Sequence, residues 1–233
     1  MIGWFDTPGG PTLAELVVQG LSSIEGGYDR LSAKFDQSVF RTPDPVLDGL
    51  QSQFFPCRSA LDIGCGTGAV LQRLQPFASE LVGLDLSRNM LARARAQLGP
   101  DPVLLRHDFL RTYWEGRFDL ITSVGVLGHI PPGRQAEFFR RVWLALKPGG
   151  VFLTVVGDLR GRPLVYLPAL TFDTMMRVRN LLWRPTFVMY YLSFVLPRAQ
   201  QVLESQGFAC QIEEGHFPVP FAQLKVLKAR RLS

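Results

Sequence analysis

The chain has 233 residues, of which 47% are hydrophobic, a size and composition that suit one α/β domain with a modest insertion and argue against a second full domain. Its three cysteines, Cys57, Cys65 and Cys210, are widely spaced, which argues against a disulfide framework and a zinc site, so no metal is expected. The net charge of +5 is not gathered into a basic block with interleaved aromatic residues, so a nucleic-acid partner is not favoured.

The first residues, MIGWFDTPGG, lack a basic region followed by an apolar run, so no signal peptide is predicted and we expect a cytoplasmic protein. Three helices are predicted next, and residues 1–58 are expected to form an N-terminal helical cover. The first helix begins at the capping box from Thr12 to Glu15, the second runs through YDRLSAKFDQSVF, and the third starts at Asp44 with Pro45 in its first turn.

Strand-like and helix-like segments alternate over residues 59–157, as expected for parallel strands joined by helical crossovers. The predicted strands are Ser59–Ile63, ELVGLD, PVLLRH, Phe118–Val124 and Val151–Val156, and the predicted helices are Val70–Gln75, Asn89–Leu98 and Gly133–Leu146. This alternation predicts an α/β fold with a doubly wound, mostly parallel sheet.

The chain changes character after residue 157. Residues 158–196 are strongly apolar between interrupting arginines, and they are expected to form a helical insertion that caps a substrate. Pro197 then begins a helix that ends at Gly207. The closing segments, FACQIEE and AQLKVLKA, alternate apolar and polar residues, which predicts an antiparallel pair. We therefore expect a seven-stranded sheet with an antiparallel edge strand.

The segment LDIGCGTGAV places Gly64, Gly66 and Gly68 between a predicted strand and a predicted helix. Because these residues have no side chains, a ligand can approach the backbone closely, and the pattern indicates a nucleotide-type turn. The turn alone does not choose the cofactor, since Gly64, Gly66 and Ala69 also satisfy the dinucleotide fingerprint. Asp62 puts a carboxylate beside the pocket, which suits an ammonium group better than a pyrophosphate and favours an amino-acid-bearing cofactor.

From Tyr28 to Gly157 the sequence resembles the class I S-adenosylmethionine-dependent methyltransferases, whose first motif is very like LDIGCGTG, with an acid in the position of Asp62. LKPGG, at Leu146 to Gly150, completes the likeness. The resemblance implies that the glycine turn passes under the methionyl part of the cofactor and that Asp62 holds its amino group. Residues 59–157 would then be the cofactor-binding core.

Asp85 ends the second predicted strand, about twenty residues beyond the glycines, where a carboxylate can accept hydrogen bonds from two ribose hydroxyls. The matching acid of the family has that role. A cap on the following helix is the alternative, but Ser87 and Asn89 lie nearer to the helix start and cap better.

Asp108 follows the third predicted strand and resembles the family acid that accepts from the adenine amino group, while Leu86 and Phe109 are candidates to sandwich the purine. The alternative is a turn-forming aspartate followed by a core phenylalanine. The complete predicted cofactor-binding set is Asp62, Gly64, Cys65, Gly66, Gly68, Asp85, Leu86, Asp108, Phe109 and Ser123, in which Cys65 is a small turn residue rather than a nucleophile.

His129 follows the fourth predicted strand in FDLITSVGVLGHI, which resembles the family's fourth motif. It is the candidate general base, because an imidazole titrates near neutral pH, and a packed loop histidine is the alternative. The segment has no Asn/Asp-Pro-Pro-Tyr/Phe sequence, so the resemblance makes exocyclic amines and glutamine less favoured as acceptors.

The insertion contains TFDTMMRVRNLLWR, which is expected to form an amphipathic helix. Its apolar side would carry Phe172, Met175, Met176, Leu181 and Leu182, and its polar side Arg177, Asn180 and Arg184. Such a cap suits an acceptor with an apolar body and an acidic group. Core packing and peripheral membrane contact are the alternatives, and no transmembrane segment is expected, because the apolar run is too short.

The sequence therefore predicts S-adenosylmethionine-dependent methyl transfer to a small-molecule acceptor. Methyl transfer is an in-line displacement that relies on alignment, so few reactive side chains are required. Two alternatives stay open at this point, an NAD(P)-dependent oxidoreductase and a non-catalytic S-adenosylmethionine-binding protein.

Overall fold

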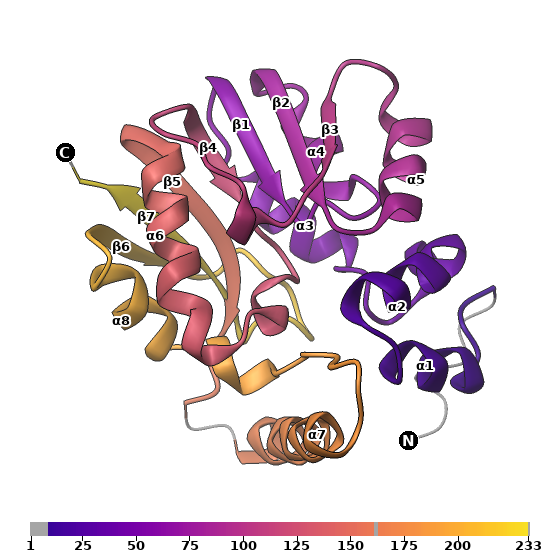
Figure 1. The fold of residues 1–233 in the computed structure, drawn as a ribbon. Coiled ribbons are helices and arrows are strands. Elements are labelled where there is room, and N and C mark those ends of the chain that lie inside the picture. The colour runs from indigo at the N-terminus through magenta and orange to yellow at the C-terminus, as the bar shows by residue number, and fades with distance from the viewer. Residues whose placement is uncertain (1–8, 161–162, 233) are drawn as a thin grey trace.

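A computed structural model of the chain describes residues 9–160 and 163–232. Within them, seven strands form one sheet in the order β3-β2-β1-β4-β5-β7-β6 (Figure 1). The strands are β1 (Cys57–Ile63), β2 (Ala78–Asp85), β3 (Val103–Arg106), β4 (Phe118–Thr122), β5 (Leu146–Gly157), β6 (Phe208–Glu213) and β7 (Leu224–Arg231). Pairs among β1 to β5 are parallel, whereas β7 is antiparallel to β5 and β6. The predicted doubly wound, mostly parallel sheet is confirmed.

The predicted antiparallel strand pair lies at the edge of the sheet. β7 stands between β5 and β6, so β6 forms the edge of the sheet. The predicted pairing of the two closing segments is present, with Phe208 opposite Arg231. β7 takes the inner place because its Val226, Leu227 and Ala229 are all buried, as an inner strand covered on both faces requires, whereas most of β6 remains partly exposed.

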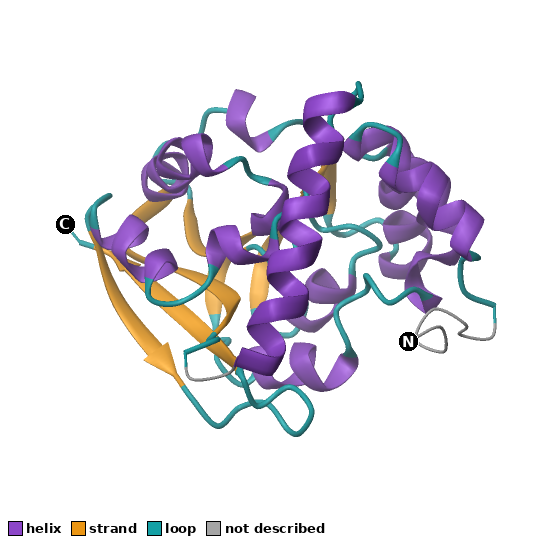
Figure 2. Ribbon diagram, turned by 90° about the horizontal axis from the view of Figure 1, so that it is seen from below, coloured by secondary structure: helices purple, strands orange, loops and turns teal. Residues whose placement is uncertain are grey.

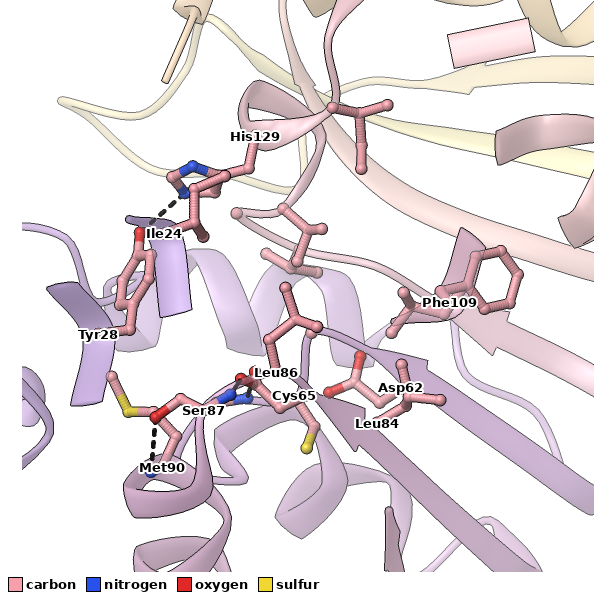
Figure 3. Close-up of a pocket in the computed structure, with 18 of the residues that line it drawn as sticks. Ile24, Tyr28, Asp62, Cys65, Leu84, Leu86, Ser87, Met90, Phe109 and His129 are labelled. Atoms are coloured by element: carbon pink, nitrogen blue, oxygen red, sulfur yellow. Dashed lines mark hydrogen bonds between the residues drawn. The ribbon is translucent and has the colours of Figure 1, made fainter. Parts of the chain in front are cut away.

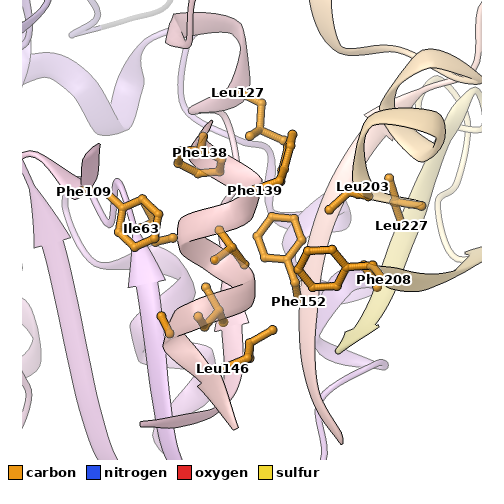
Figure 4. Packing of buried hydrophobic residues seen from close by; sticks show 14 of the residues in the cluster. Ile63, Phe109, Leu127, Phe138, Phe139, Leu146, Phe152, Leu203, Phe208 and Leu227 are labelled. Atoms are coloured by element: carbon orange, nitrogen blue, oxygen red, sulfur yellow. The ribbon is translucent and has the colours of Figure 1, made fainter. Parts of the chain in front are cut away.

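Helices cover both faces of this sheet. α3 (Asp44–Gln51), α4 (Ala69–Leu74) and α5 (Arg88–Leu98) pack on one face, and α6 (Gln135–Ala145) and α8 (Arg198–Glu204) pack on the other. The second face has an aromatic core, in which Phe139 of α6 packs against Phe138 of the same helix and against Phe152 of β5 (Figure 4). Because parallel strands are buried on both faces, their apolar runs were readable in the sequence.

The N-terminal cover begins with α1 (Leu13–Gly20), which has the predicted capping box. The Thr12 hydroxyl accepts from the backbone N–H of Glu15, and the Glu15 carboxylate accepts from the backbone N–H of Thr12. The third helix, α3, also starts at Asp44 as predicted. Residues 1–8 of the predicted cover lie outside the described residues.

The second helix differs from the prediction of one helix through YDRLSAKFDQSVF. α2 spans Ile24–Leu31, and the chain then tightens into the 3-10 helix η2 (Ser32–Gln37). The helix starts earlier because the Ser23 hydroxyl caps it at Gly26. It tightens where the Ser32 hydroxyl donates to the backbone carbonyl of Asp29 and so competes with the regular helical pattern.

α7 (Pro163–Leu182) is the predicted helical insertion after β5, of which residues 161–162 lie outside the described part. It lies away from the sheet, at the bottom of Figure 1 and lengthwise across the centre of Figure 2. No helix of the described residues is both long enough and apolar enough to cross a bilayer.

The exposure of α7 disagrees with the cap and core-packing interpretations, in which its apolar side lies inward. Of the side expected to pack, Met176 is buried, but Met175, Leu181 and Leu182 are exposed. Asp173 and Asn180 are buried instead, because they bind the backbone of the segment that returns toward α8, residues 183–197. Polar anchoring of that segment, and not apolar burial, sets the rotation of the helix.

Candidate cofactor and acceptor site

A cavity of about 390 Å³ opens at the carboxyl ends of β1, β2 and β4 (Figure 3). β1 lies between β2 and β4, so the strand order reverses at this point of the sheet. Ligands of open α/β sheets bind at such switch points. The turns after the strands line one part of the cavity, and α2, η2 and the segment after α7 supply the opposite walls.

The predicted glycine turn joins β1 to α4 and lines this cavity. Gly64 has a φ of +72°, and a side chain there would place a Cβ 2.0 Å from a methyl carbon of Val126. Gly66 has a φ of +53°, and its backbone N–H donates to Asp85 across 2.9 Å. Only glycine fits both positions without strain, so the turn presents bare backbone to the cavity.

Asp62 is buried at the end of β1 and its carboxylate faces the cavity (Figure 3). One oxygen accepts from the Thr122 hydroxyl across 2.7 Å. Burial raises the pKa of the carboxyl to about 7, the Thr122 hydrogen bond opposes that rise, and the nearby Asp85 adds to it. No basic side chain of the described residues pairs with Asp62, whose one side-chain hydrogen-bond partner among them is Thr122.

Asp85 ends β2 and holds the turns around the cavity in place. One carboxylate oxygen accepts from Gly66 N–H and the other from Ser87 N–H, at 2.9 and 2.8 Å. Burial raises its pKa, and these backbone hydrogen bonds oppose the rise. Each oxygen keeps a further lone pair, which can accept a hydrogen bond from a ligand hydroxyl. Helix α5 is capped by Ser87, as expected, which leaves Asp85 free of the capping role.

Leu86, Asp108 and Phe109 also line the cavity. Leu86 projects into it and is partly exposed, whereas Phe109 is buried against Phe138 and Trp114. Asp108 accepts from the backbone N–H of Leu110 and caps the short 3-10 helix that follows β3. The turn-forming and core-packing alternatives therefore describe part of what Asp108 and Phe109 do, and their adenine contacts stay a prediction.

Two residues of the predicted cofactor set do not line the cavity. Gly68, with a φ of +93°, sits where a Cβ would lie 2.7 Å from a methyl carbon of Leu98, so its glycine serves the packing of α4 on α5. Ser123 is buried and donates to the backbone carbonyl of Ile63. Cys65 does line the cavity, but burial raises the pKa of its thiol well above the ordinary value, which fits a turn residue and not a nucleophile.

His129 lies on a 3-10 turn after β4 and faces the cavity from the side opposite Asp62 (Figure 3). Its Nδ1 is 2.6 Å from the backbone carbonyl of Val188, which only accepts, so Nδ1 carries the proton. Nε2 is therefore an acceptor, and it receives the Tyr28 hydroxyl across 2.8 Å. Burial lowers the pKa of the imidazole, although the bond to Val188 opposes this, so His129 is neutral near pH 7.

Sequence reasoning missed the residues that join the N-terminal cover to the site. Tyr28 reaches His129 across 101 residues of chain. Asp29 accepts from the Ser87 hydroxyl across 2.5 Å, and Asp36 accepts from the Thr67 hydroxyl across 2.7 Å. They lie on α2 and η2, and no local pattern distinguishes them from solvent-facing polar residues.

The wall away from the glycine turn is largely apolar. Its side chains come from the N-terminal cover, the loop after β4 and the return segment, residues 183–197. They include Ile24, Phe35, Phe40, Ile130 and Val188. Two arginines lie among them, but each is already paired, Arg41 with Asp44 and Arg134 with Glu137. Arg177 and Arg184 of the insertion do not line the cavity, so the arginines expected at the margin of the acceptor pocket are absent from it in the described structure.

Known proteins resemble the chain in the region of this site. A family model described as a methyltransferase domain matches residues 60–150. Cyclopropane mycolic acid synthase MmaA2 of Mycobacterium tuberculosis (strain ATCC 25618 / H37Rv) is 30% identical over 179 residues, which are 74% of this chain and 58% of that protein. A probable fatty acid methyltransferase of Pseudomonas putida is 28% identical over 145 residues, 54% of this chain and 37% of that protein. The chain thus spans less than two thirds of the length of these curated relatives.

Solved structures share the fold. The structure of the DhpI–SAH complex matches this chain with a TM-score of 0.68 at 20% sequence identity. The match covers 95% of this chain and 99% of the DhpI chain. An S-adenosylmethionine-dependent methyltransferase from Mesorhizobium loti has a TM-score of 0.59 at 25% identity, with 80% of this chain and 96% of that chain covered. The match to DhpI extends over nearly the whole length of both chains.

Proposed function

Because the chain belongs to the class I S-adenosylmethionine-dependent methyltransferases, we propose that it transfers the methyl group of that cofactor to a small molecule with an apolar, lipid-like body. The observation that carries the proposal is the Asp62 carboxylate. It is buried, it has no basic partner in the described part of the chain, and it faces a turn of bare glycine backbone. An amino-acid nucleoside that carries an ammonium group matches both features.

The residues present fit this cofactor, and each has a distinct role in the proposal. Asp62 pairs with the ammonium group, and the Gly64–Gly66 backbone lies against the methionyl chain. Asp85 accepts from the ribose hydroxyls with its free lone pairs, while Asp108, Leu86 and Phe109 surround the adenine. When bound, the cofactor supplies an electrophilic methyl group that an acceptor atom displaces in line.

The apolar wall supports an acceptor with an apolar body. Ile24, Phe40 and Val188 offer no polar group to an acceptor, so they bind it by burial alone. The names of two relatives, a mycolic acid synthase and a probable fatty acid methyltransferase, are in keeping with this class. An acidic group on the acceptor is not part of the proposal, since Arg41 and Arg134 are engaged by carboxylates.

Tyr28 and His129 handle the proton of an acceptor that must lose one. The Tyr28 hydroxyl already donates to Nε2 of His129, and burial raises the pKa of the phenol, so Tyr28 is neutral. The phenolic oxygen takes the acceptor's proton while its own proton moves to Nε2. His129 is thus the base and Tyr28 the group that contacts the acceptor, and the Val188 carbonyl stabilises the imidazolium that results.

Binding and turnover test the proposal separately. Calorimetry of the purified protein with S-adenosylhomocysteine and with NAD⁺ should give micromolar affinity for the first and none for the second. Transfer of a labelled methyl group to fatty alcohols of increasing chain length should then improve with length, because each buried methylene adds binding energy. Absence of S-adenosylhomocysteine binding at millimolar concentration refutes the cofactor assignment. Binding without transfer to any small molecule would instead favour the non-catalytic alternative.

A further inference from the structure

Helix α7 turns an apolar stripe to solvent. At about 100° per residue, the outward apolar side chains fall on one side of the helix, where the exposed Thr171 and Thr174 interrupt them. The outward apolar side chains are Leu167, Leu170, Met175, Val178, Leu181 and Leu182. Leu181 is 82% exposed and Leu182 is 76% exposed. Six large apolar side chains exposed along one side of a helix mark an interaction surface, unlike apolar residues scattered singly.

The stripe cannot turn inward without loss of hydrogen bonds. The two oxygens of Asp173 accept from the backbone N–H groups of Tyr191 and Leu192 at 2.7 and 3.1 Å. Asn180 accepts from the N–H of Phe187 and donates to its carbonyl, both at 3.0 Å. Burial of the stripe by rotation would leave these buried polar groups without partners, so the outward orientation is built into the fold.

α1 extends the apolar surface. Its Leu13, Val17, Val18 and Leu21 are exposed. The end of α1 lies against α7, where Arg179 reaches the backbone carbonyl of Ser22 across 3.5 Å, and both helices lie on the side of the molecule that faces the viewer in Figure 2. We call the exposed apolar residues of these two helices, Leu13, Val17, Val18, Leu21, Leu167, Leu170, Met175, Val178, Leu181 and Leu182, the apolar underside.

The charges around the apolar underside are positive. Residues 163–203 contain four arginines and one acid, Asp173, which is buried and engaged by backbone. Arg177 and Arg179 flank Val178, about 100° to either side of it. The Arg177 guanidinium lies over the Tyr190 ring, 4.4 Å from its centroid, and that of Arg179 donates to Asn180 and to the Pro185 carbonyl, so both positive charges stay beside the stripe. Arg184 follows the end of the helix and is exposed. The acid of α1, Glu15, is paired with Lys34. An apolar stripe between arginines complements a surface that is apolar within and anionic at its boundary.

We propose that the apolar underside docks on an anionic lipid membrane, with the α7 stripe among the acyl chains and Arg177 and Arg184 at the headgroups. A second copy of the chain would bring together two surfaces that both carry positive charge, which the charge pattern disfavours. Ile24, Thr186 and Val188 lie in α2 and the return segment, next to these helices, and line the apolar wall of the cavity. The further step, in which a lipid-like acceptor enters the cavity from the bilayer, depends on the proposed function. The docking itself depends only on the apolar underside and its arginines.

Co-sedimentation with vesicles tests the docking. The wild-type chain should bind vesicles that contain phosphatidylglycerol, and the bound fraction should fall as salt rises. Arg177→Gln with Arg184→Gln should weaken that binding by about fivefold for each arginine removed. Leu167→Glu with Leu181→Glu should abolish it, since carboxylates would enter the apolar layer. Val103→Glu is the matched control, because Val103 is also exposed but begins β3 at the opposite end of the strands, and it should bind as wild type does.

Affinity for S-adenosylhomocysteine, measured on every variant, separates this proposal from the proposed function. It should be unchanged in all of them, which also shows that each variant folds. Failure of the wild type to sediment with vesicles overturns the docking and leaves the cofactor assignment intact. The docking is also overturned if Val103→Glu weakens vesicle binding as much as the α7 substitutions do. It is overturned as well if light scattering shows that the wild type is a dimer and that Leu167→Glu with Leu181→Glu converts it to a monomer.

Discussion

Substitution of Asp62 by asparagine separates the cofactor role of this carboxyl from its effect on stability. Asparagine keeps an oxygen that accepts from the Thr122 hydroxyl and removes the charge. The folded protein without cofactor holds the Asp62 pKa at about 7, against an ordinary value of 3.8, because the group is buried. Between those pH values the folded state keeps a proton that the unfolded chain has lost, so the free energy of unfolding falls as pH rises.

The pKa difference gives the size of the effect. About three units at 1.36 kcal/mol each amount to a loss of about 4 kcal/mol between pH 4 and pH 7. Asp62→Asn removes this loss, so the melting temperature of the cofactor-free variant should exceed that of the wild type at pH 8 by several degrees. The two should converge near pH 4.5, where Asp62 is protonated in the folded protein.

Cofactor binding should show the opposite behaviour. S-adenosylhomocysteine keeps a protonated amino group below pH 7, so it binds to the ionised form of Asp62. Calorimetry should find that wild-type affinity rises by roughly 15-fold from pH 5.5 to pH 7, as a group with a pKa near 7 ionises. Asp62→Asn should bind at least tenfold more weakly at pH 7.

The matched control is Asp119→Asn, since Asp119 lies on β4 near the opposite end of the strands, where it binds Ser59 and Lys147. It should retain both the affinity and the pH profile of the wild type. If Asp62→Asn binds S-adenosylhomocysteine as tightly as the wild type, or keeps the steep pH profile, Asp62 does not pair with the ammonium group.

Three further substitutions probe the turn, the acceptor wall and the insertion. Gly64→Ala places a Cβ 2.0 Å from Val126 and should lower the free energy of unfolding in urea by a few kcal/mol. Val126→Ala should restore part of that loss, and a Gly64→Ala variant as stable as the wild type would contradict the close approach. Tyr28→Phe should lower kcat with little change in S-adenosylhomocysteine affinity, and unchanged kcat would remove Tyr28 from the proton path. Asp173→Ala should cost about 2 kcal/mol and expose residues 183–192 to proteolysis, whereas wild-type protection would show that its two backbone bonds do not hold the segment.

The parts of the site that local sequence encodes were predictable. A buried apolar strand, a turn that requires glycine and a following helix lie within residues 57–74, so the position of Asp62, Gly64 and Gly66 beside a cavity was predictable. Asp85 followed because parallel strands end at the same edge of the sheet. Ser123 was misplaced because neighbouring residues of a strand point to opposite sides, and Thr122 is the one that reaches Asp62.

The helical insertion was predicted, but which of its sides lies inward was not. A helical pattern with one apolar side is ordinarily read with that side inward, since burial usually dominates. In α7 the polar side chains of Asp173 and Asn180 find backbone partners in residues 187–192, a contact between segments that periodicity alone does not reveal. The Tyr28 bond to His129 is of the same kind, because it depends on how the cover docks on the sheet.

This difference explains why the sequence identifies the cofactor more readily than the acceptor. The proposed cofactor half of the cavity is formed by turns that each follow one strand, so its residues lie in short segments such as LDIGCGTG. The acceptor half is formed where α2, η2 and the return segment meet, and its apolar character arises only when Ile24, Phe35 and Val188 come together. Those walls are attached to the core by individual polar contacts, Asp29 to Ser87 and Asp36 to Thr67, which lie beside the cofactor turns. A bound cofactor that orders those turns would therefore also steady the wall against which the acceptor is aligned.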